Sequence, residues 1–264
     1  MFKKYTPLIL GLLIGSQESR GQELNIKPQI NPENIFEVVG SSYQLDNIEG
    51  WLEKFQDQVH NTDKYEQTPL HKASDLAVIR ILVEHGAKID ALDEFGYTPL
   101  HSIASNWWLQ GDVVDYLVQQ GTNVNALTID KTTPLHKACE CGNFSIVKCL
   151  IKYNANVNAA NKYGTTPLHL AARSGCVKIV DYLIQHGANV NAVDKYGKTP
   201  LSQAWSWPIV HKLVRHGAMD IRGICASHAM EMSLYIPKMA LGLTLYKLHN
   251  IIHGNNNLKE DVLS

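Results

Sequence analysis

Thr166-Pro167-Leu168-His169 opens the segment from Asn161 to Ala192, and this tetrapeptide decides how the chain of 264 residues is interpreted. The same four residues, or a near copy, occur five times, and the fifth copy ends in Ser202 instead of histidine. The copies begin at Thr68, Thr98, Thr133, Thr166 and Thr199, so the spacings are 30, 35, 33 and 33 residues. Self-similarity at a nearly fixed period of this size indicates a stack of repeated supersecondary units.

Each copy carries signals for a pair of helices. The threonine is a good N-cap, and the proline that follows suits the first helical position, where its missing N–H costs nothing. The second helix is indicated by an apolar stripe farther along each unit, for example Ile179, Val180 and Leu183, which has the spacing of a buried helix face. Four of these stripes end at a glycine that can adopt a left-handed conformation: Gly86, Gly121, Gly187 and Gly217. The third ends at Asn154, and asparagine is the best non-glycine substitute there.

These motifs closely resemble the ankyrin repeat family, from about residue 33 to residue 220. The resemblance implies an all-α repeat solenoid, in which antiparallel helix pairs are stacked and joined by short β-hairpin-like finger loops. We also expect divergent helical caps at the two ends, because one face of a terminal unit meets water. Functionally, the resemblance implies a module that binds a protein partner without catalysis; we expect no cofactor and a monomer.

The chain then divides in order. Residues 1–21 are a candidate signal peptide or N-terminal tail, 22–32 a linker, and 33–62 a degenerate N-terminal capping repeat. Four ankyrin repeats are expected at 63–92, 93–127, 128–160 and 161–193, with a short repeat at 194–220. Residues 221–253 are expected to form a helical C-terminal cap, and 254–264 a disordered tail.

Two segments leave the localisation open. Met1 to Ile14 carries two lysines before an apolar run, which fits a secretory signal and is too short to span a bilayer. The chain is therefore expected to be exported if this signal is real, and cytoplasmic if it is a tail. Residues 224–252 fit a capping helix pair, with a membrane-surface helix as the alternative.

The repeats differ in length, and the differences point to candidate sites. The final glycine follows the threonine by 21 residues in the fourth unit, by 18 in the first and fifth, and by 23 in the second. We expect all these changes to fall in the turn between the two helices. The enlarged turn from Ser105 to Gly111 carries Trp107 and Trp108, and tryptophan is enriched at interface hot spots. The alternative is that such rings fill gaps left by altered turns, which we favour for Trp205 and Trp207.

The tips of the expected fingers form a second candidate site. Stacking would align two variable positions of each unit, one partly basic and one largely aromatic. The first position holds Lys64, Glu94, Ile129, Lys162 and Lys195, and the second holds Tyr65, Phe95, Asp130, Tyr163 and Tyr196. The candidate partner-binding residues are therefore Lys64, Tyr65, Glu94, Phe95, Trp107, Trp108, Lys162, Tyr163, Lys195 and Tyr196. The alternative is that the aromatic tips only pack on neighbouring fingers.

Several other functions have little support in the sequence. A net charge of −1 argues against a general nucleic-acid binder. The odd number of cysteines, five, argues against a disulfide framework. Four of the twelve histidines recur with the repeat, where we expect hydrogen bonds that brace the loop, and none has metal-ligand spacing. No catalytic signature stands out, so we expect neither an enzyme nor a metal site.

The main hypothesis is a protein-interaction module that uses the finger tips, the first helices and the enlarged tryptophan loop. The alternative hypothesis is a passive structural spacer, tethered to a membrane by an uncleaved N-terminal apolar segment or by residues 224–252. Membrane contact is otherwise not expected.

Overall fold

A computed structural model describes residues 35–40, 50 and 54–218 of the chain. The chain divides into two compact units, residues 1–32 and 33–264, and every described residue belongs to the second. The expected signal or tail, the linker, the C-terminal cap and the C-terminal tail therefore lie outside the described residues.

Five helix pairs follow one another along the described part of the chain, after α1 (Ile35–Gly40) and the 3-10 helix η2 (Gln56–Gln58). The first helices of the pairs are α3 (Pro69–Lys72), α5 (Pro99–Ala104), α7 (Pro134–Cys141), α9 (Pro167–Ser174) and α11 (Pro200–Gln203). The second helices are α4 (Leu76–Glu84), α6 (Gly111–Gln119), α8 (Phe144–Lys152), α10 (Val177–Gln185) and α12 (Trp207–Arg215). These residues contain no β-strand, so the expected all-α repeat fold is confirmed for them.

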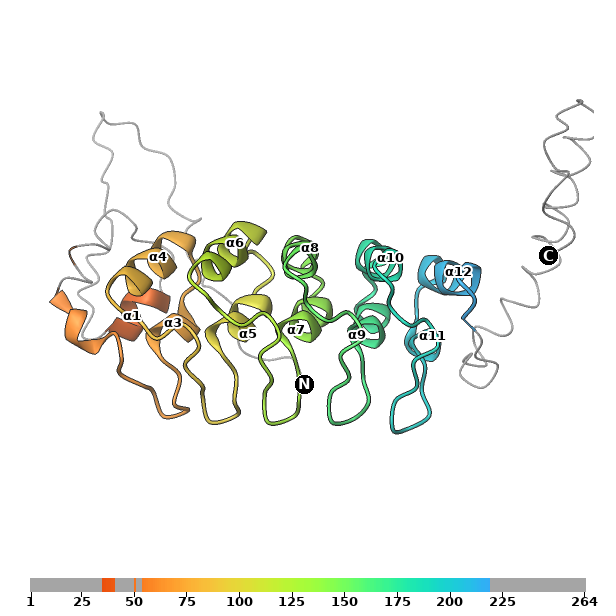
Figure 1. Cartoon of the computed structure of the whole chain (residues 1–264), viewed down its shortest axis with the longest axis horizontal. Helices are drawn as coiled ribbons and strands as arrows, with labels where there is room; N and C mark the ends of the chain where they lie inside the picture. Colours follow the sequence, from red (N-terminus) through yellow and green to blue (C-terminus); the bar gives the residue numbers. More distant parts are fainter. Residues whose placement is uncertain (1–34, 41–49, 51–53, 219–264) are drawn as a thin grey trace, which may run out of the picture. The chain divides into compact units, whose positions relative to one another are not determined.

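The helix pairs stack in two rows, with fingers projecting from the row of first helices (Figure 1). Each first helix packs on the first helix of the next pair, and each second helix on the next second helix. One core runs through all the pairs, with the motif leucines Leu100 and Leu135 and the second-helix residues Ile146 and Ile179 completely buried. Helix α1 packs on α3, so it covers the first pair. Each unit therefore buries its apolar faces against its neighbours.

The ends of the helices follow the expected local chemistry. In α7, Thr133 Oγ1 accepts the N–H of His136 at 3.4 Å, and Pro134 occupies the first helical position. At the end of α10, Gly187 has a φ of 83°, in the left-handed region that glycine tolerates best. Asn154, which replaces this glycine in the third unit, has a φ of 61° as expected.

The shortened units differ from the expectation, because the first helix is cut and not the turn. Helices α3 and α11 have four residues each, whereas α7 and α9 have eight. The turn after α3 (73–75) is one residue longer than the turn after α7 (142–143). All five second helices keep nine residues because their buried stripes pack between neighbouring units. The deletion therefore falls on the last turn of the first helix. In the second unit the turn is enlarged as expected, and α5 is also two residues shorter than α7.

Candidate functional site

Each finger is a tight loop that is closed by its own side chain. In the second finger, Asp93 Oδ1 accepts the backbone N–H groups of Phe95 at 2.9 Å and Tyr97 at 2.8 Å. The backbone N–H of Asp93 also donates to the carbonyl of Tyr97 at 3.0 Å. Asp63, Asn161 and Asp194 make the same side-chain contacts in their fingers. Short side chains of this kind stabilise turns by bonding to the backbone a few residues onward.

Backbone hydrogen bonds join the tips of the fingers in series. The N–H of Glu94 donates to the carbonyl of Tyr65 at 3.2 Å, and the N–H of Lys195 donates to the carbonyl of Tyr163 at 2.9 Å. The two links between them run from Ile129 to Phe95 at 3.1 Å and from Lys162 to Asp130 at 2.8 Å. Eight of the ten predicted partner-binding residues therefore lie on one continuous surface, which we call the finger-tip row: Lys64, Tyr65, Glu94, Phe95, Lys162, Tyr163, Lys195 and Tyr196, with Ile129 and Asp130 between them.

The finger-tip row exposes unusually much apolar surface. Tyr196 is 71% exposed and Phe95 54%, although both side chains are large and apolar. Eight of the twelve exposed large hydrophobic residues in the described chain lie on fingers: Tyr65, Leu92, Phe95, Leu127, Ile129, Tyr163, Val193 and Tyr196. Concentrated exposed apolar surface marks a binding site more often than a scatter of single residues does.

Leu92, Leu127 and Val193 belong to this exposed surface but were not predicted from the sequence. Each directly precedes the residue that closes its finger, and each is 57–60% exposed. The repeat pattern does place an apolar residue at this position, directly before the polar turn of the finger. Periodicity alone, however, does not show that a side chain at this position faces solvent.

Two lysines of the finger-tip row, Lys64 and Lys162, fold onto neighbouring side chains. Lys162 forms an ion pair with Asp130 of the preceding finger, and its ammonium lies 5.0 Å from the centre of the Tyr163 ring. Lys64 lies in the same way over Tyr65, at 4.7 Å. The tips therefore present aromatic rings that are held in place beside positive charge.

The enlarged loop places Trp107 and Trp108 elsewhere on the molecule. It leaves the C-terminal end of α5, whereas the fingers lead into the N-terminal ends of the first helices. The two indoles meet edge to face with centroids 5.6 Å apart, and 72% of Trp107 and 52% of Trp108 are exposed. Trp108 Nε1 donates to the carbonyl of Ser74 in the preceding unit at 3.3 Å. The structure thus separates the two predicted sites.

A buried asparagine holds this loop from the following unit. Asn143 Nδ2 donates to the carbonyls of Asn106 at 2.8 Å and Leu109 at 2.9 Å, and Asn143 Oδ1 accepts the N–H of Ile146 at the start of α8. Leu109 is itself buried in the core. Hydrogen bonds therefore hold the loop on both sides of the two tryptophans, so the backbone that carries them is fixed.

Trp205 and Trp207 behave differently from each other. Trp207 is partly buried against the core, as expected for a ring that fills a gap. Trp205 is 63% exposed, donates Nε1–H to the carbonyl of Arg173 at 2.9 Å, and lies so close to Gly175 that a Cβ there would be 2.7 Å from the ring. Trp205 therefore covers the end of α9.

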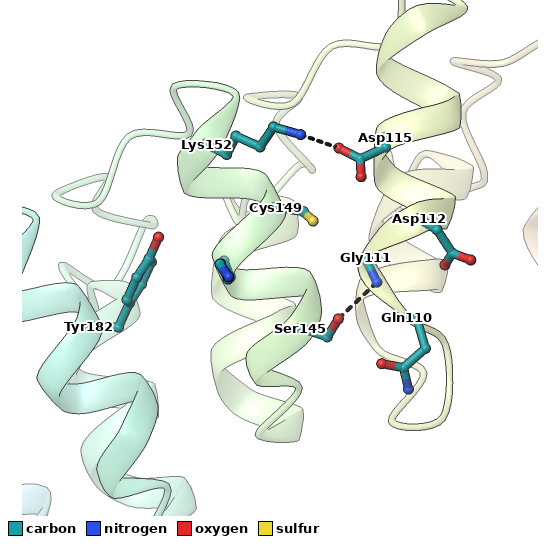
Figure 2. A pocket seen from close by; sticks show the side chains of 9 residues that line it. Gln110, Gly111, Asp112, Asp115, Ser145, Cys149, Lys152 and Tyr182 are labelled. Atoms are coloured by element: carbon teal, nitrogen blue, oxygen red, sulfur yellow. Dashed lines mark hydrogen bonds and ion pairs between the residues drawn. The ribbon is translucent and has the colours of Figure 1, made fainter.

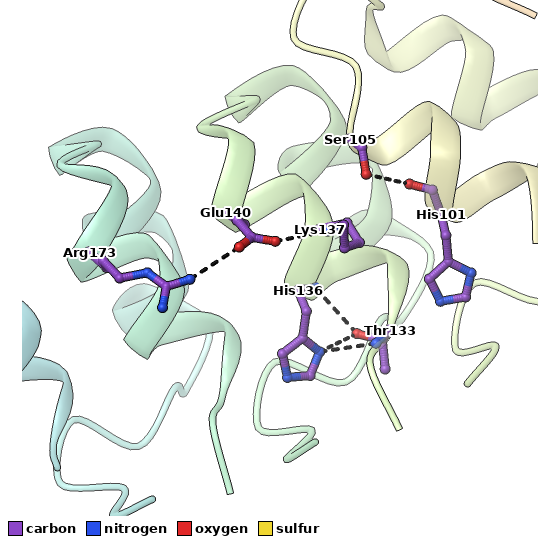
Figure 3. Close-up of polar contacts among 7 residues, drawn as sticks. All are labelled: His101, Ser105, Thr133, His136, Lys137, Glu140 and Arg173. Atoms are coloured by element: carbon purple, nitrogen blue, oxygen red, sulfur yellow. Dashed lines mark hydrogen bonds and ion pairs between the residues drawn. The ribbon is translucent and has the colours of Figure 1, made fainter. Parts of the chain in front are cut away.

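The motif histidines link consecutive units, and Figure 3 shows the part of this arrangement that lies within one unit, where His136 contacts Thr133. His136 Nδ1 accepts the N–H of Thr133 at 3.2 Å, so the proton lies on Nε2, which donates to the carbonyl of Thr165 at 3.0 Å. His71, His101 and His169 repeat this arrangement. Burial lowers the pKa of His101 and His136 to about 4 and also lowers the pKa of His71 and His169. These neutral imidazoles brace the loops before the first helices, as predicted.

Ser202 ends this series of bridges. It stands where the earlier units have histidine, and its hydroxyl donates to the carbonyl of Thr199 within its own unit at 2.8 Å. Among the described residues, no group of three or more His, Cys, Asp or Glu side chains is placed to hold a metal ion.

A groove of about 540 Å³ lies on the second helices, lined by residues of α6, α8 and α10 (Figure 2). Lys152 Nζ lies 2.8 Å from Asp115 Oδ1, and the hydroxyl of Tyr153 donates to the same oxygen at 2.7 Å. These hydrogen bonds lower the pKa of the Asp115 carboxyl. The ion pair spans the groove and ties α8 to α6, so these charged groups are already engaged within the chain.

Together these features define a linear repeat protein, which offers one extended surface and not an enclosed site. Residues 41–128 and 103–194 match the family model described as ankyrin repeats (3 copies). The chain belongs to the ankyrin repeat family. Ankyrin repeats are generally protein–protein interaction modules and are generally non-catalytic.

Two relatives share shorter segments. The chain is 43% identical over 67 residues to an ankyrin repeat protein of Rickettsia bellii (strain RML369-C), and 40% identical over 62 residues to one of fowlpox virus (strain NVSL). These segments cover 24% and 23% of this chain, but only 27% and 12% of the two relatives.

The described residues contain no helix with both the length and the apolar character needed to cross a bilayer. The expected membrane-surface alternative concerns residues 224–252, which lie outside them.

Proposed function

We propose that this chain binds a partner protein without catalysis, mainly through the finger-tip row, with the Trp107-Trp108 loop as a second contact. The observation that carries the proposal is the series of backbone hydrogen bonds that holds exposed aromatic tips side by side. Aromatic side chains supply much of the binding energy at protein interfaces, because they bury a large area with few torsions to immobilise.

Preorganisation supports this assignment of the surface. Each tip is fixed by a side chain of its own finger and by the backbone of the neighbouring finger, so binding would order few additional torsions. A surface that loses little conformational freedom on binding keeps more of its interaction energy as affinity. The tryptophan loop has the same property, since Asn143 and Ser74 anchor it from two neighbouring units.

The test is affinity capture with the intact chain and two double variants. We expect Tyr163→Ala/Tyr196→Ala to reduce recovery of an identified partner by at least about tenfold, the equivalent of 1.4 kcal/mol. Trp107→Ala/Trp108→Ala tests the loop separately. Lys178→Ala/Gln185→Ala, on exposed positions of α10, serves as the control.

Circular dichroism must show that each variant keeps its helices. If both aromatic double variants recover the partner as well as the control does, neither surface is the binding site. If the intact chain recovers no partner at all, the result favours the passive spacer instead.

We also propose that residues 1–21 direct export. The support is the pair of lysines followed by the apolar run within Met1 to Ile14. Expression in a secreting host, followed by N-terminal sequencing, tests this: we expect an exported product that begins near residue 22. Retention of Met1 in the exported or cell-associated protein would contradict it.

A further inference from the structure

We propose that the three fingers nearest the C-terminal end of the described stack bind an acidic protein segment, one rich in carboxylates and carrying aliphatic or aromatic side chains. These fingers are residues 126–132, 159–165 and 192–198, and we call them the basic fingers. The inference rests on the proposed function, and it adds the chemistry of the partner.

The basic fingers carry positive charge that the chain does not neutralise. Lys131, Lys195 and Lys198 are exposed, and none forms an ion pair with another residue in the part of the chain that the structure describes. The whole chain has a net charge of −1, so this excess is local. A local cluster of one sign attracts partners of the opposite sign and speeds their association.

The carboxylates on the same fingers are already engaged. Asp194 is buried, and its Oδ1 accepts the N–H groups of Tyr196 and Lys198 at 2.8 Å each. Asp130 forms the ion pair with Lys162. The acidic groups of these fingers therefore hold the loops together, while three of the lysines remain available to a partner.

The two fingers at the other end have a different charge pattern. Lys64 is exposed there, but so are Glu66 and Glu94, and Asp63 pairs with Lys72 at 3.2 Å. An acidic segment is therefore attracted to the basic fingers and repelled near the exposed glutamates. The charge pattern thus selects the three basic fingers over the two fingers at the other end.

The apolar residues between the lysines favour protein over nucleic acid. Leu127, Ile129 and Val193 are 57–71% exposed, and aliphatic side chains offer a partner's apolar groups a contact that bases use poorly. The basic fingers also carry lysine and no arginine, whereas arginine is preferred for bidentate phosphate contacts. Carboxylate side chains alternating with apolar ones would match both features of the surface.

The experiment is an unbiased selection of random linear peptides, displayed as a library, on the immobilised full chain. We expect the recovered pool to be enriched in Asp and Glu, and in aliphatic or aromatic residues, relative to the input. Binding of the most enriched peptide should weaken with added salt, because exposed charges are screened. It should fall by about tenfold for Lys195→Glu/Lys198→Glu.

The matched control is Lys148→Glu/Lys178→Glu, which makes the same change in net charge on exposed positions of α8 and α10. It should leave peptide binding within about twofold, because those lysines lie on the second helices. Circular dichroism and gel filtration must show that both double variants fold. An equal loss of peptide binding in the two double variants would show that only the net charge of the chain matters, and would overturn the proposal.

Three further results would also overturn it: no enrichment, a neutral or basic pool, or binding of a fluorescein-labelled single-stranded DNA more tightly than the best peptide. Tyr163→Ala/Tyr196→Ala separates this failure from a failure of the proposed function. If that variant loses an identified protein partner while the selected pool is not acidic, the finger-tip row binds protein and only the inferred chemistry is wrong.

Discussion

The side-chain amide of Asn143 lies 2.9 Å from the backbone carbonyl of Leu109, across the boundary between two repeats. The same nitrogen reaches the carbonyl of Asn106 at 2.8 Å, while the oxygen caps α8. One buried side chain therefore closes the enlarged loop and starts the next helix. Because a carboxylate can cap but cannot donate, the two roles can be separated by mutation.

We expect Asn143→Asp to lower the free energy of unfolding by about 1–3 kcal/mol, since two buried carbonyls lose their donor and face a negative charge. Urea denaturation measures this loss. Asn156→Asp is the control: Asn156 is exposed, and its side-chain oxygen accepts the backbone N–H of Asn158, a local bond that a carboxylate can also accept. A result within about 0.5 kcal/mol of the wild type for both variants would show that the donated bonds are dispensable.

We expect Gly111→Ala to be destabilising for a steric reason. A Cβ at this position would overlap Cys149 Sγ and would lie 3.1 Å from the carbonyl oxygen of Ser145. Overpacking of this kind costs about 1–3 kcal/mol. Removing the sulfur by Cys149→Ala in the same chain should recover part of the loss, so the two substitutions should be non-additive in a double-mutant cycle of urea unfolding. Strictly additive effects would place the strain elsewhere.

We expect stability to fall below neutral pH because of the motif histidines. Burial lowers the pKa of His136 to about 4, whereas an unfolded histidine titrates near 6.5. As the pH falls, the unfolded chain binds the proton first. This contribution to stability is therefore complete above about pH 6.5 and is lost as the pH drops toward 4, at up to about 1.4 kcal/mol per pH unit for each such histidine.

His136→Gln tests this prediction, since glutamine does not titrate and can still accept one hydrogen bond and donate another. Urea unfolding should be measured between about pH 7.5 and 5, within the range in which histidine titrates. The free energy of unfolding should depend less steeply on pH in the variant than in the wild type. Equal slopes would mean that His136 does not contribute to the acid sensitivity.

The finger turns offer a test of backbone strain. Lys131 has a φ of 57° at the position that Gly164 and Gly197 occupy in later fingers, with φ values of 77° and 74°. The left-handed region costs a non-glycine residue about 1–2 kcal/mol, and glycine adds about 0.4–1 kcal/mol of unfolded-chain entropy. We therefore expect Lys131→Gly to stabilise the chain slightly, by about 0.5 kcal/mol.

The reverse substitution should be clearly unfavourable. In Gly164→Ala the new Cβ would lie 3.1 Å from both Asp194 Cα and the Lys195 nitrogen of the next finger, in addition to the left-handed backbone. Thermal unfolding should show a lower midpoint for Gly164→Ala and a similar or higher one for Lys131→Gly. The opposite order would contradict the strain argument.

Local residue chemistry accounts for what could be predicted about the fold. The threonine and proline of each motif specify where a helix starts, the glycine or Asn154 where it ends, and the apolar stripe which face is buried. Because each unit contacts only its neighbours, these local signals also specify the stack. The same frame aligned the finger tips, since stacking in register needs only the period.

The sequence by itself thus determined the repeat, the order of the helices and the candidate residues at the finger tips. Only the tertiary structure decided which parts of a unit could be deleted or enlarged: the first helix lost a turn in two units, because the second helix packs along its whole apolar stripe. It alone showed that Asn143 holds the tryptophan loop and that Leu92, Leu127 and Val193 are exposed. It also showed that Asp130 and Asp194 are engaged within the chain, while Lys195 has no acidic partner among the described residues. The contacts of Asn143 with the loop and of Asp130 with Lys162 join residues about one repeat apart, and their geometry depends on how neighbouring units meet.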